Sequence, residues 1–389
     1  MSAPLHLPQQ LESANQTITA RCHCKSVNLT ITLPTSTLPL PVHICHCQIC
    51  RYIHGTPCIF HAPIPHGIEP DFVSPSSLET SLTGYTHAHA TAERFFCSTC
   101  GCHMGDRTLQ PDPETGKPKW HIATSIFTPN SESIFQIRSH TFTASCKGDG
   151  LYSWLHSVNG RDLHTWNPSP EDKESSIPRP PTPQKQFDDT DGKEQVLLAE
   201  CHCSGVKFTI PRPTAEEKSD EFLSRFVSKE DDGTKRIAGL CLCADCRLVD
   251  GTHVVGWTFA PLRTLKPTIP AGFAGFGTLK AYRSSEKVLR AFCGKCGATV
   301  FYTSDDEDRA PSDEKRVVDV AVGILRAPEG DVAAEAWLTW QTGRLAGMES
   351  GKVYDEGFAE GLRVGMEEWG RKKYGKVVEF NIPQDVVAE

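Results

Sequence analysis

The chain has 389 residues, a formal net charge of −8 and a hydrophobic content of 38%. This length suits about two domains of roughly 150 residues each. The acidic balance and the lack of a concentrated basic stripe argue against nucleic-acid binding, and no window approaches the ~20 apolar residues of a membrane span. The first residues, MSAPLHLPQQLESANQ, contain neither a basic region nor an apolar stretch, so we expect no secretory signal and a cytoplasmic or nuclear location.

In chain order, the sequence divides into five segments. Residues 1–14 are predicted to form a flexible tail. A β-rich first domain is expected over 15–167, where stretches such as TITARCHCKSVNLTITLP alternate in the manner of strands. Residues 168–194 are rich in proline, serine and charge, which predicts a linker. The second domain is assigned to 195–345, and a C-terminal helix and tail to 346–389.

The C-terminal segment has helical periodicity. Apolar residues recur on one face at Phe358, Leu362, Met366 and Trp369, which predicts an amphipathic helix packed on the domain. Gly357, Gly361 and Gly365 recur every four residues and would permit close approach, although they lower helix propensity. Interleaved charges exclude a membrane dimer of glycine-packed helices. A segment that binds a partner protein is the alternative.

Seventeen cysteines are many for an intracellular chain. Structural disulfides are rare in reducing compartments, where clustered cysteines more often bind metal. Fourteen of the seventeen fall into two repeated sets, each made of a C-x-C pair, a C-x-C-x-x-C triplet and a C-x-x-C-G pair. The other three, Cys58, Cys102 and Cys146, are expected to be ordinary buried or half-buried thiols.

The two sets indicate an internal repeat. Cys97 follows Cys50 by 47 positions, and Cys293 follows Cys246 by the same 47. Other residues repeat in register with an offset of 196: Arg51 and Arg247, Gly55 and Gly251, Thr56 and Thr252, Arg94 and Arg290, Phe96 and Phe292, Gly101 and Gly297. The second copy carries 17 additional residues between its pair and its triplet, within the charged stretch EEKSDEFLSRFVSKEDDGTK, which we interpret as a surface insertion. The pattern indicates a tandem duplication.

Each repeat supplies seven thiols, and their spacing predicts two metal sites. Structural zinc is usually held by four thiolates from two knuckles, so the C-x-C and C-x-x-C pairs predict a closed site. The expected ligands are Cys22, Cys24, Cys97 and Cys100 in the first repeat and Cys201, Cys203, Cys293 and Cys296 in the second. The triplets remain: Cys45, Cys47 and Cys50, then Cys241, Cys243 and Cys246.

Three protein ligands and one open position characterise catalytic zinc, which binds water or a substrate atom. Soft thiolates favour a soft fourth ligand such as an exogenous thiol, whose pKa the metal would lower. The alternative is that the triplet completes a second structural site with a ligand from elsewhere. His46 is a tempting ligand, but Leu242 replaces it in the second copy. His23 and His202 do repeat, but strand alternation points them away from the thiols.

Arg51 and Arg247 directly follow the third thiol of each triplet. They are candidates to neutralise thiolate charge or to bind the carboxylate of a cofactor or substrate; surface arginines are the alternative. Gly55 and Gly251 are expected in a turn near the site. Tyr85 and Tyr282 correspond only across a one-residue gap, and core packing explains them best.

The motifs resemble the glutathione-dependent formaldehyde-activating enzyme family, which also includes centromere protein V. The second half carries CHCSGV, CLCADCRLVDG and YRSSEKVLRAFCGKCGATVF, and the first carries CHCKSV, CHCQICRYIHG and RFFCSTCGCHMG. The first half departs at YTHAHA, where the Y-x-S-S of the second is missing, and at Cys102 and His103. These departures place the expected activity first in the second half.

The resemblance implies a mainly β architecture of two tandem Mss4-like zinc-binding domains with two zinc ions each. It also implies that the pairs hold structural zinc, that the triplets are catalytic, and that a carbon–sulfur bond is formed or cleaved with glutathione as a co-substrate. The expected partner is a small-molecule thiol or thiol adduct, with the two domains paired within the chain. The competing hypothesis is a non-catalytic tandem zinc module for protein interaction. A chromatin role is less favoured because the chain is acidic.

Overall fold

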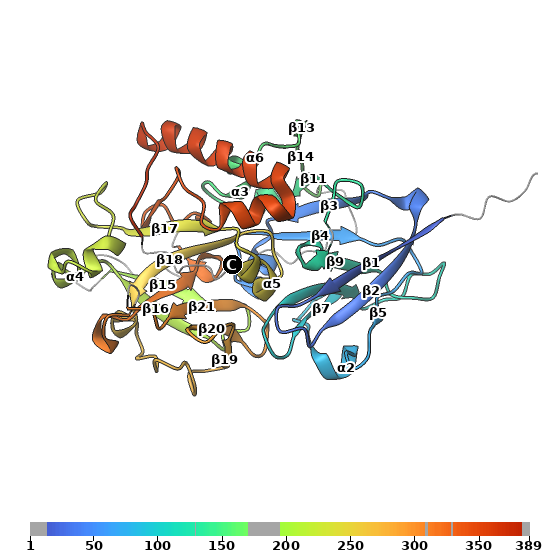
Figure 1. The fold of residues 1–389 in the computed structure, drawn as a ribbon, viewed down its shortest axis with the longest axis horizontal. Coiled ribbons are helices and arrows are strands. Elements are labelled where there is room, and N and C mark those ends of the chain that lie inside the picture. The colour runs from blue at the N-terminus through green and yellow to red at the C-terminus, as the bar shows by residue number, and fades with distance from the viewer. Residues whose placement is uncertain (1–13, 129, 170–194, 308–309, 328–329, 383–389) are drawn as a thin grey trace, which may run out of the picture.

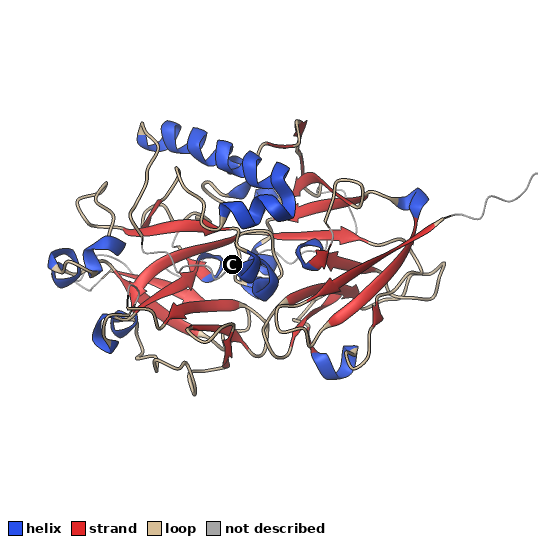
Figure 2. Cartoon of the chain, in the orientation of Figure 1, coloured by secondary structure: helices blue, strands red, loops and turns tan. Residues whose placement is uncertain are grey.

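The computed structural model describes residues 14–128, 130–169, 195–307, 310–327 and 330–382. The predicted flexible tail and linker therefore lie almost wholly outside the described residues. The described chain is mainly β, as predicted, and Figure 2 shows strands through both halves. No helix in these ranges combines the length and the apolar character of a membrane span.

The first half contains a four-stranded sheet, order β10-β1-β2-β5, and an eight-stranded sheet, order β14-β11-β3-β4-β9-β8-β7-β6. Leu29, Ile31 and Leu33 are buried and alternate with polar residues, which explains why this stretch forms a strand covering a core. The elements are β1 (Asn15–Arg21), β2 (Asn28–Pro34), η1 (Thr35–Thr37), β3 (Leu40–Cys45), α1 (Gln48–His54), β4 (Ile59–Pro63), β5 (Asp71–Phe72), α2 (Leu78–Ser81), β6 (Leu82–Tyr85), β7 (Ala92–Cys97), β8 (His103–Thr108), β9 (Trp120–Ala123), η2 (Thr124–Ile126), β10 (Phe127–Thr128), β11 (Phe135–Thr141), η3 (Thr143–Ser145), α3 (Leu151–Trp154), β12 (Ser157–Val158), β13 (Arg161–Asp162) and β14 (His164–Trp166).

The second half contains a three-stranded sheet, order β16-β15-β23, and a seven-stranded sheet, order β19-β20-β21-β22-β18-β17-β24. Its elements are β15 (Val196–Glu200), β16 (Lys207–Pro211), α4 (Ala215–Ser219), η5 (Leu223–Phe226), β17 (Arg236–Cys241), α5 (Ala244–Asp250), β18 (Val255–Pro261), η6 (Leu262–Thr264), β19 (Leu279–Arg283), β20 (Val288–Cys293), β21 (Thr299–Ser304), η7 (Asp313–Lys315), β22 (Val317–Ala321), η8 (Val322–Ile324), β23 (Leu325–Arg326), β24 (Leu338–Trp340) and α6 (Met348–Tyr374).

The two halves share one strand order. Reading from β6, the large sheet of the first half runs β6-β7-β8-β9-β4-β3-β11 and then adds β14, and the second runs β19-β20-β21-β22-β18-β17-β24. The pair β3–β11 is parallel, and so is its counterpart β17–β24. Figure 1 shows the two sheet systems side by side, with α5 near the middle of the molecule. This correspondence is what a tandem duplication would produce.

The halves contact each other reciprocally. The backbone N–H of His23 donates to the carbonyl oxygen of Leu248 at 3.2 Å, and that of His202 donates to the carbonyl oxygen of Tyr52 at 3.0 Å. His23 corresponds to His202 by its place in the C-x-C pair, and Tyr52 corresponds to Leu248 after the triplet. An interface that uses equivalent residues from both sides is the kind formed by a two-fold symmetric dimer.

The predicted C-terminal helix is α6, and its apolar face is buried as expected. The fully or nearly buried residues are Phe358, Leu362, Met366 and Trp369. A Cβ added at Gly361 or Gly365 would meet the carbonyl oxygen of Ser157 or Trp154. The glycines therefore bring α6 against the first half, and Figure 1 shows it reaching from the second half toward α3 and β11.

The 17-residue insertion is more than a surface loop, and that interpretation is wrong for its apolar residues. Leu223 and Phe226 in η5 are 2% and 1% exposed. Glu217 in α4 pairs with Arg236 at 2.7 Å, and both side chains are buried. Only a few apolar residues and one buried ion pair anchor the segment. Its largely charged composition therefore does not indicate these contacts.

Candidate metal centres

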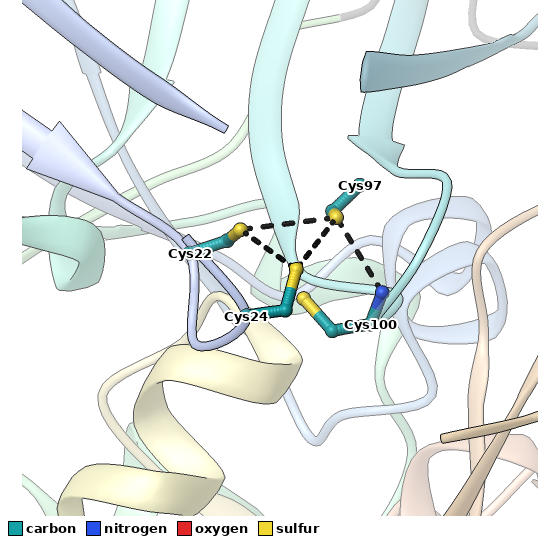
Figure 3. Close-up of side chains that lie close together, drawn as sticks. All are labelled: Cys22, Cys24, Cys97 and Cys100. Atoms are coloured by element: carbon teal, nitrogen blue, oxygen red, sulfur yellow. Dashed lines mark hydrogen bonds between the residues drawn. The ribbon is translucent and has the colours of Figure 1, made fainter. Parts of the chain in front are cut away.

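The first four-thiol site lies where two turns of the first half meet. Cys22 and Cys24 follow β1, while Cys97 ends β7 and Cys100 precedes β8. Their Sγ atoms all lie within 4.8 Å of one another, and Figure 3 shows the four side chains gathered together. The Sγ atoms of Cys22 and Cys24 are 3.4 Å apart, and those of Cys24 and Cys97 are 3.6 Å apart.

This arrangement fits zinc bound by thiolates. A tetrahedron with metal–sulfur bonds of about 2.3 Å has sulfur–sulfur edges of about 3.8 Å, close to the separations in this cluster. The backbone N–H groups of Val27 and Cys100 donate to Sγ of Cys22 and Cys97, both at 3.4 Å. A hydrogen bond with Cys100 lowers the pKa of Cys97 to about 6, whereas hydrogen bonds with its three neighbours raise the pKa of Cys100. Four adjacent thiols need a cation to ionise together.

The second four-thiol site repeats this geometry. It consists of Cys201, Cys203, Cys293 and Cys296. Sγ of Cys203 lies 3.6 Å from that of Cys201 and 3.5 Å from that of Cys293. The backbone N–H of Val206 donates to Cys201 at 3.3 Å, the counterpart of the Val27 contact. All seventeen cysteines are free thiols, so no thiol of these clusters is used in a disulfide.

The first three-thiol site is built at the start of α1. Cys45 ends β3, Cys47 caps α1, and the backbone N–H of Cys50 donates to Sγ of Cys47 at 3.3 Å. These thiols lie within 4.8 Å of one another, and no other Cys, His, Asp or Glu of the described chain joins the cluster. His46 points elsewhere, because its Nε2 lies 2.9 Å from Nδ1 of buried His140.

The second three-thiol site forms in the same way at α5. It contains Cys241, Cys243 and Cys246, and the backbone N–H of Cys246 donates to Sγ of Cys243 at 3.4 Å. The residues of both triplets are thus brought together as predicted, with three protein sulfurs in each group. A soft divalent cation such as zinc suits this donor set, and an exogenous sulfur suits the fourth position.

Two arginines that received no role from the sequence contact the triplets. Arg94 donates to Sγ of Cys50 at 3.7 Å, and Arg290 donates to Sγ of Cys246 at 3.4 Å. Hydrogen bonds with Cys45 and Cys47 lower the pKa of Cys50, and the charge of Arg94 adds to that shift. The available signal was that this arginine repeats in register three positions before the C-x-x-C-G pair.

Arg51 and Arg247 are buried against protein instead. Arg51 is 2% and Arg247 is 9% exposed. Arg247 donates to the carbonyl oxygen of Ser125 in the other half, and its guanidinium lies 3.6 Å from the ring centre of Tyr354. Their role in carboxylate binding stays a prediction, and these contacts place Arg247 in the packing between the halves.

The repeated histidines and tyrosines join the two halves. Nδ1 of His23 lies 2.7 Å from the hydroxyl of Tyr282, and Nδ1 of His202 lies 2.8 Å from the hydroxyl of Tyr85. Neither histidine belongs to a thiol cluster, as expected, but both lie in turns after a strand, so strand alternation is not the reason. The tyrosines do more than pack in a core. Nε2 of His23 also lies 3.4 Å from the Asp245 carboxylate in α5, so the first four-thiol turn supports the helix of the second three-thiol site.

The three cysteines outside the repeats behave as expected. Cys58 and Cys102 are fully buried, and Cys146 is half-buried. Burial raises the pKa of Cys58 and of Cys102, which keeps these thiols protonated and unreactive.

The surroundings of the two three-thiol sites differ. Cys243 and Cys246 belong to an apolar cluster with η5, β18 and β21. Its buried members include Leu223, Phe226, Trp257, Phe259 and Tyr302, and Phe222, Phe380 and Ile382 pack against it. In the first half, Cys45 and Cys47 are half-buried, and the neighbouring strands carry histidine and aspartate. The insertion and the last described residues thus pack in the same cluster as the second site, and the insertion has no counterpart in the first half.

Comparison with known proteins supports the family assignment for one repeat. Residues 17–145 match the family model described as glutathione-dependent formaldehyde-activating enzyme. That match spans the first four-thiol site and the first three-thiol site. A search of curated proteins finds no match.

Proposed function

We propose that this chain, whose first half carries a domain of the glutathione-dependent formaldehyde-activating enzyme family, is a zinc-dependent carbon–sulfur lyase-like enzyme. Its substrate would be glutathione or another thiol in adduct with a small aldehyde. The observation that carries this proposal is the three-thiol site, where three sulfurs gather beside an arginine and no fourth protein ligand joins them in the described chain.

The protein residues have separate tasks in this scheme. Cys45, Cys47 and Cys50 would hold zinc, which supplies Lewis acidity and keeps a bound thiol ionised. Arg94 beside Cys50 offsets the negative charge of three thiolates. The four-thiol site fixes the turns at the ends of β1 and β7.

The apolar surroundings of the second triplet favour the first half as the site of reaction, although the motif pattern had favoured the second. Cys243 and Cys246 lie in the apolar cluster, whereas no thiol of the first triplet belongs to an apolar core cluster of the described chain. A substrate as polar as glutathione suits a polar surrounding better than an apolar one. The family match also covers the first half.

The alternative, a non-catalytic zinc module for protein interaction, gains support at the second site only. There the insertion and C-terminal residues pack in one apolar cluster with Cys243 and Cys246, which suits a structural metal. We therefore propose a division of labour in which the first repeat reacts and the second stabilises the pair.

A matched pair of variants tests this proposal. Zinc content is measured for wild type, Cys47→Ser and Cys243→Ser. The glutathione affinity of the same three proteins is measured calorimetrically. We expect glutathione to bind wild type and Cys243→Ser, and binding to disappear in Cys47→Ser. If zinc is present at every site but glutathione never binds, the enzyme proposal fails. If binding survives unchanged in Cys47→Ser but not in Cys243→Ser, the assignment to the first repeat is wrong.

A further inference from the structure

Three acid–base side chains meet on adjacent strands of the first half. His61 lies on β4, His121 on β9 and Asp106 on β8. Nδ1 of His61 lies 3.1 Å from one Asp106 oxygen, and Nδ1 of His121 lies 3.0 Å from the other. The side chain of His61 is 8% exposed and that of His121 is 41% exposed. One carboxylate therefore joins a buried imidazole to a solvent-accessible one.

The strand register places this group on the same sheet face as the first three-thiol site. Cys45 and His43 lie two residues apart on β3, and His43 pairs with His61. Asp106 pairs with both Arg94 and His121. Residues two apart on a strand and residues directly opposite each other share a face. Because Arg94 also contacts Cys50, the face runs continuously from the thiols to the histidines.

The second half has different chemistry at the same register positions. Trp257 stands where the first half has His61, since it pairs with the counterpart of His43. Tyr302 pairs with Arg290 and with Asp319, so these two replace Asp106 and His121. Trp257 and Tyr302 belong to the apolar cluster around Cys243. The imidazole–carboxylate group is thus specific to the first repeat.

The environment favours a charged carboxylate and a titrating imidazole. Burial opposes charge at His121, but its hydrogen bond and charge interaction with Asp106 outweigh burial and raise its pKa. Burial likewise opposes charge at Asp106, but hydrogen bonds with the two histidines lower its pKa. The charged or titratable groups facing His121 are Asp106 from β8, His61 from β4, His43 from β3, Lys119 beside β9, Arg94 from β7 and Cys50 from α1.

We propose that His121 is the proton-transfer residue of the first three-thiol site and that Asp106 and His61 position it; this rests on the proposed carbon–sulfur chemistry. With Nδ1 held by Asp106, Nε2 of His121 takes the hydroxyl proton of a hydroxyalkyl thioether. The oxygen–hydrogen electron pair becomes the carbonyl bond, the carbon–sulfur bond breaks, and its electron pair stays on sulfur. The products are an aldehyde and a thiolate, with the proton on His121; the reverse sequence forms the adduct.

Two measurements test the proposal. The first follows exchange between formaldehyde plus glutathione and their adduct by NMR across a pH series. We expect His121→Gln to lower the exchange rate by about 100-fold or more. The ionisation of a base should also disappear from the pH profile of the rate, while glutathione affinity stays within about twofold of wild type. Asp319→Asn, the matched change in the second half, should leave rate and pH profile unchanged.

The second measurement is independent of activity. The imidazole of His121 is titrated by NMR in wild type and in Asp106→Asn, with zinc content as the check on folding. Loss of the carboxylate should lower the pKa of His121 and move the acid limb of the rate profile to lower pH. An unchanged His121 titration overturns the pairing, and an active His121→Gln with an unchanged pH profile overturns the catalytic role. If wild type binds glutathione but never exchanges it, the proposed function fails instead, whatever the titration shows.

Discussion

Replacement of Gly251 by alanine should separate the two halves. Gly251 ends α5 with φ 68°, a left-handed conformation that alanine adopts at a cost. A Cβ there would meet the backbone N, C and O atoms of His103 in the other half. Gly55 ends α1 with φ 77°, and its Cβ would meet the corresponding atoms of Thr299. These glycines serve the turns predicted from the sequence and also allow the contact between the halves.

The chain provides a matched control in Gly375. It ends α6 with φ 73°, and nothing lies within 4 Å of an added Cβ. Gly375→Ala should therefore lower the free energy of unfolding only by the cost of placing alanine in the left-handed conformation, about 1–2 kcal/mol. Gly251→Ala and Gly55→Ala add an overlap with rigid backbone, worth about 1–3 kcal/mol more, for about 2–5 kcal/mol in total.

Urea unfolding measured by tryptophan fluorescence would give the three free energies, and small-angle scattering would report the radius of gyration. We expect the two interface variants to be less stable than Gly375→Ala and more extended in solution. Equal losses in all three variants, with an unchanged radius of gyration, would refute the packing described for the halves.

Three further predictions concern packing and pH. Phe358→Ala in α6 should lower the free energy of unfolding by about 3–5 kcal/mol, measured in urea, because this side chain is 2% exposed; a loss below about 1 kcal/mol would contradict its core position. Glu217→Gln should cost about 3–5 kcal/mol by leaving Arg236 buried without its partner, and an unchanged urea midpoint would show that the insertion is not anchored. Burial lowers the pKa of His253 to about 3, so the unfolded chain binds a proton that the folded chain does not. As the pH falls below about 6.5, the free energy of unfolding should decrease by up to about 1.4 kcal/mol per pH unit for this group. The thermal midpoint of His253→Gln should depend less steeply on pH than that of wild type, and an identical dependence would exclude the contribution.

The grouping of the thiols was predictable because their spacing is local and repeated. The C-x-C, C-x-x-C and triplet patterns place sulfurs in turns whose geometry the sequence determines, and all fourteen thiols fall into the expected groups. The periodicity of Phe358, Leu362, Met366 and Trp369 likewise predicted the buried face of α6. Its contact with Trp154 and Ser157 was not predictable, because it depends on how the halves are placed.

The acid–base group was missed for a physical reason. His61, Asp106 and His121 are far apart in the sequence, and only the sheet order β4-β9-β8 makes them neighbours. No repeat signal marks them, since Trp257, Tyr302 and Asp319 occupy those positions in the second half. Arg94 is the opposite case. It repeats in register in the sequence, but only the structure shows its contact with Cys50.

The most direct test of the central claim detects a thiol on zinc at the first three-thiol site. Zinc-edge X-ray absorption is recorded with glutathione in which selenium replaces sulfur, so that a zinc–selenium shell reports direct coordination. We predict this shell in wild type and in Cys243→Ser, and its absence in Cys47→Ser. Full zinc content in wild type without any zinc–selenium shell would contradict the account.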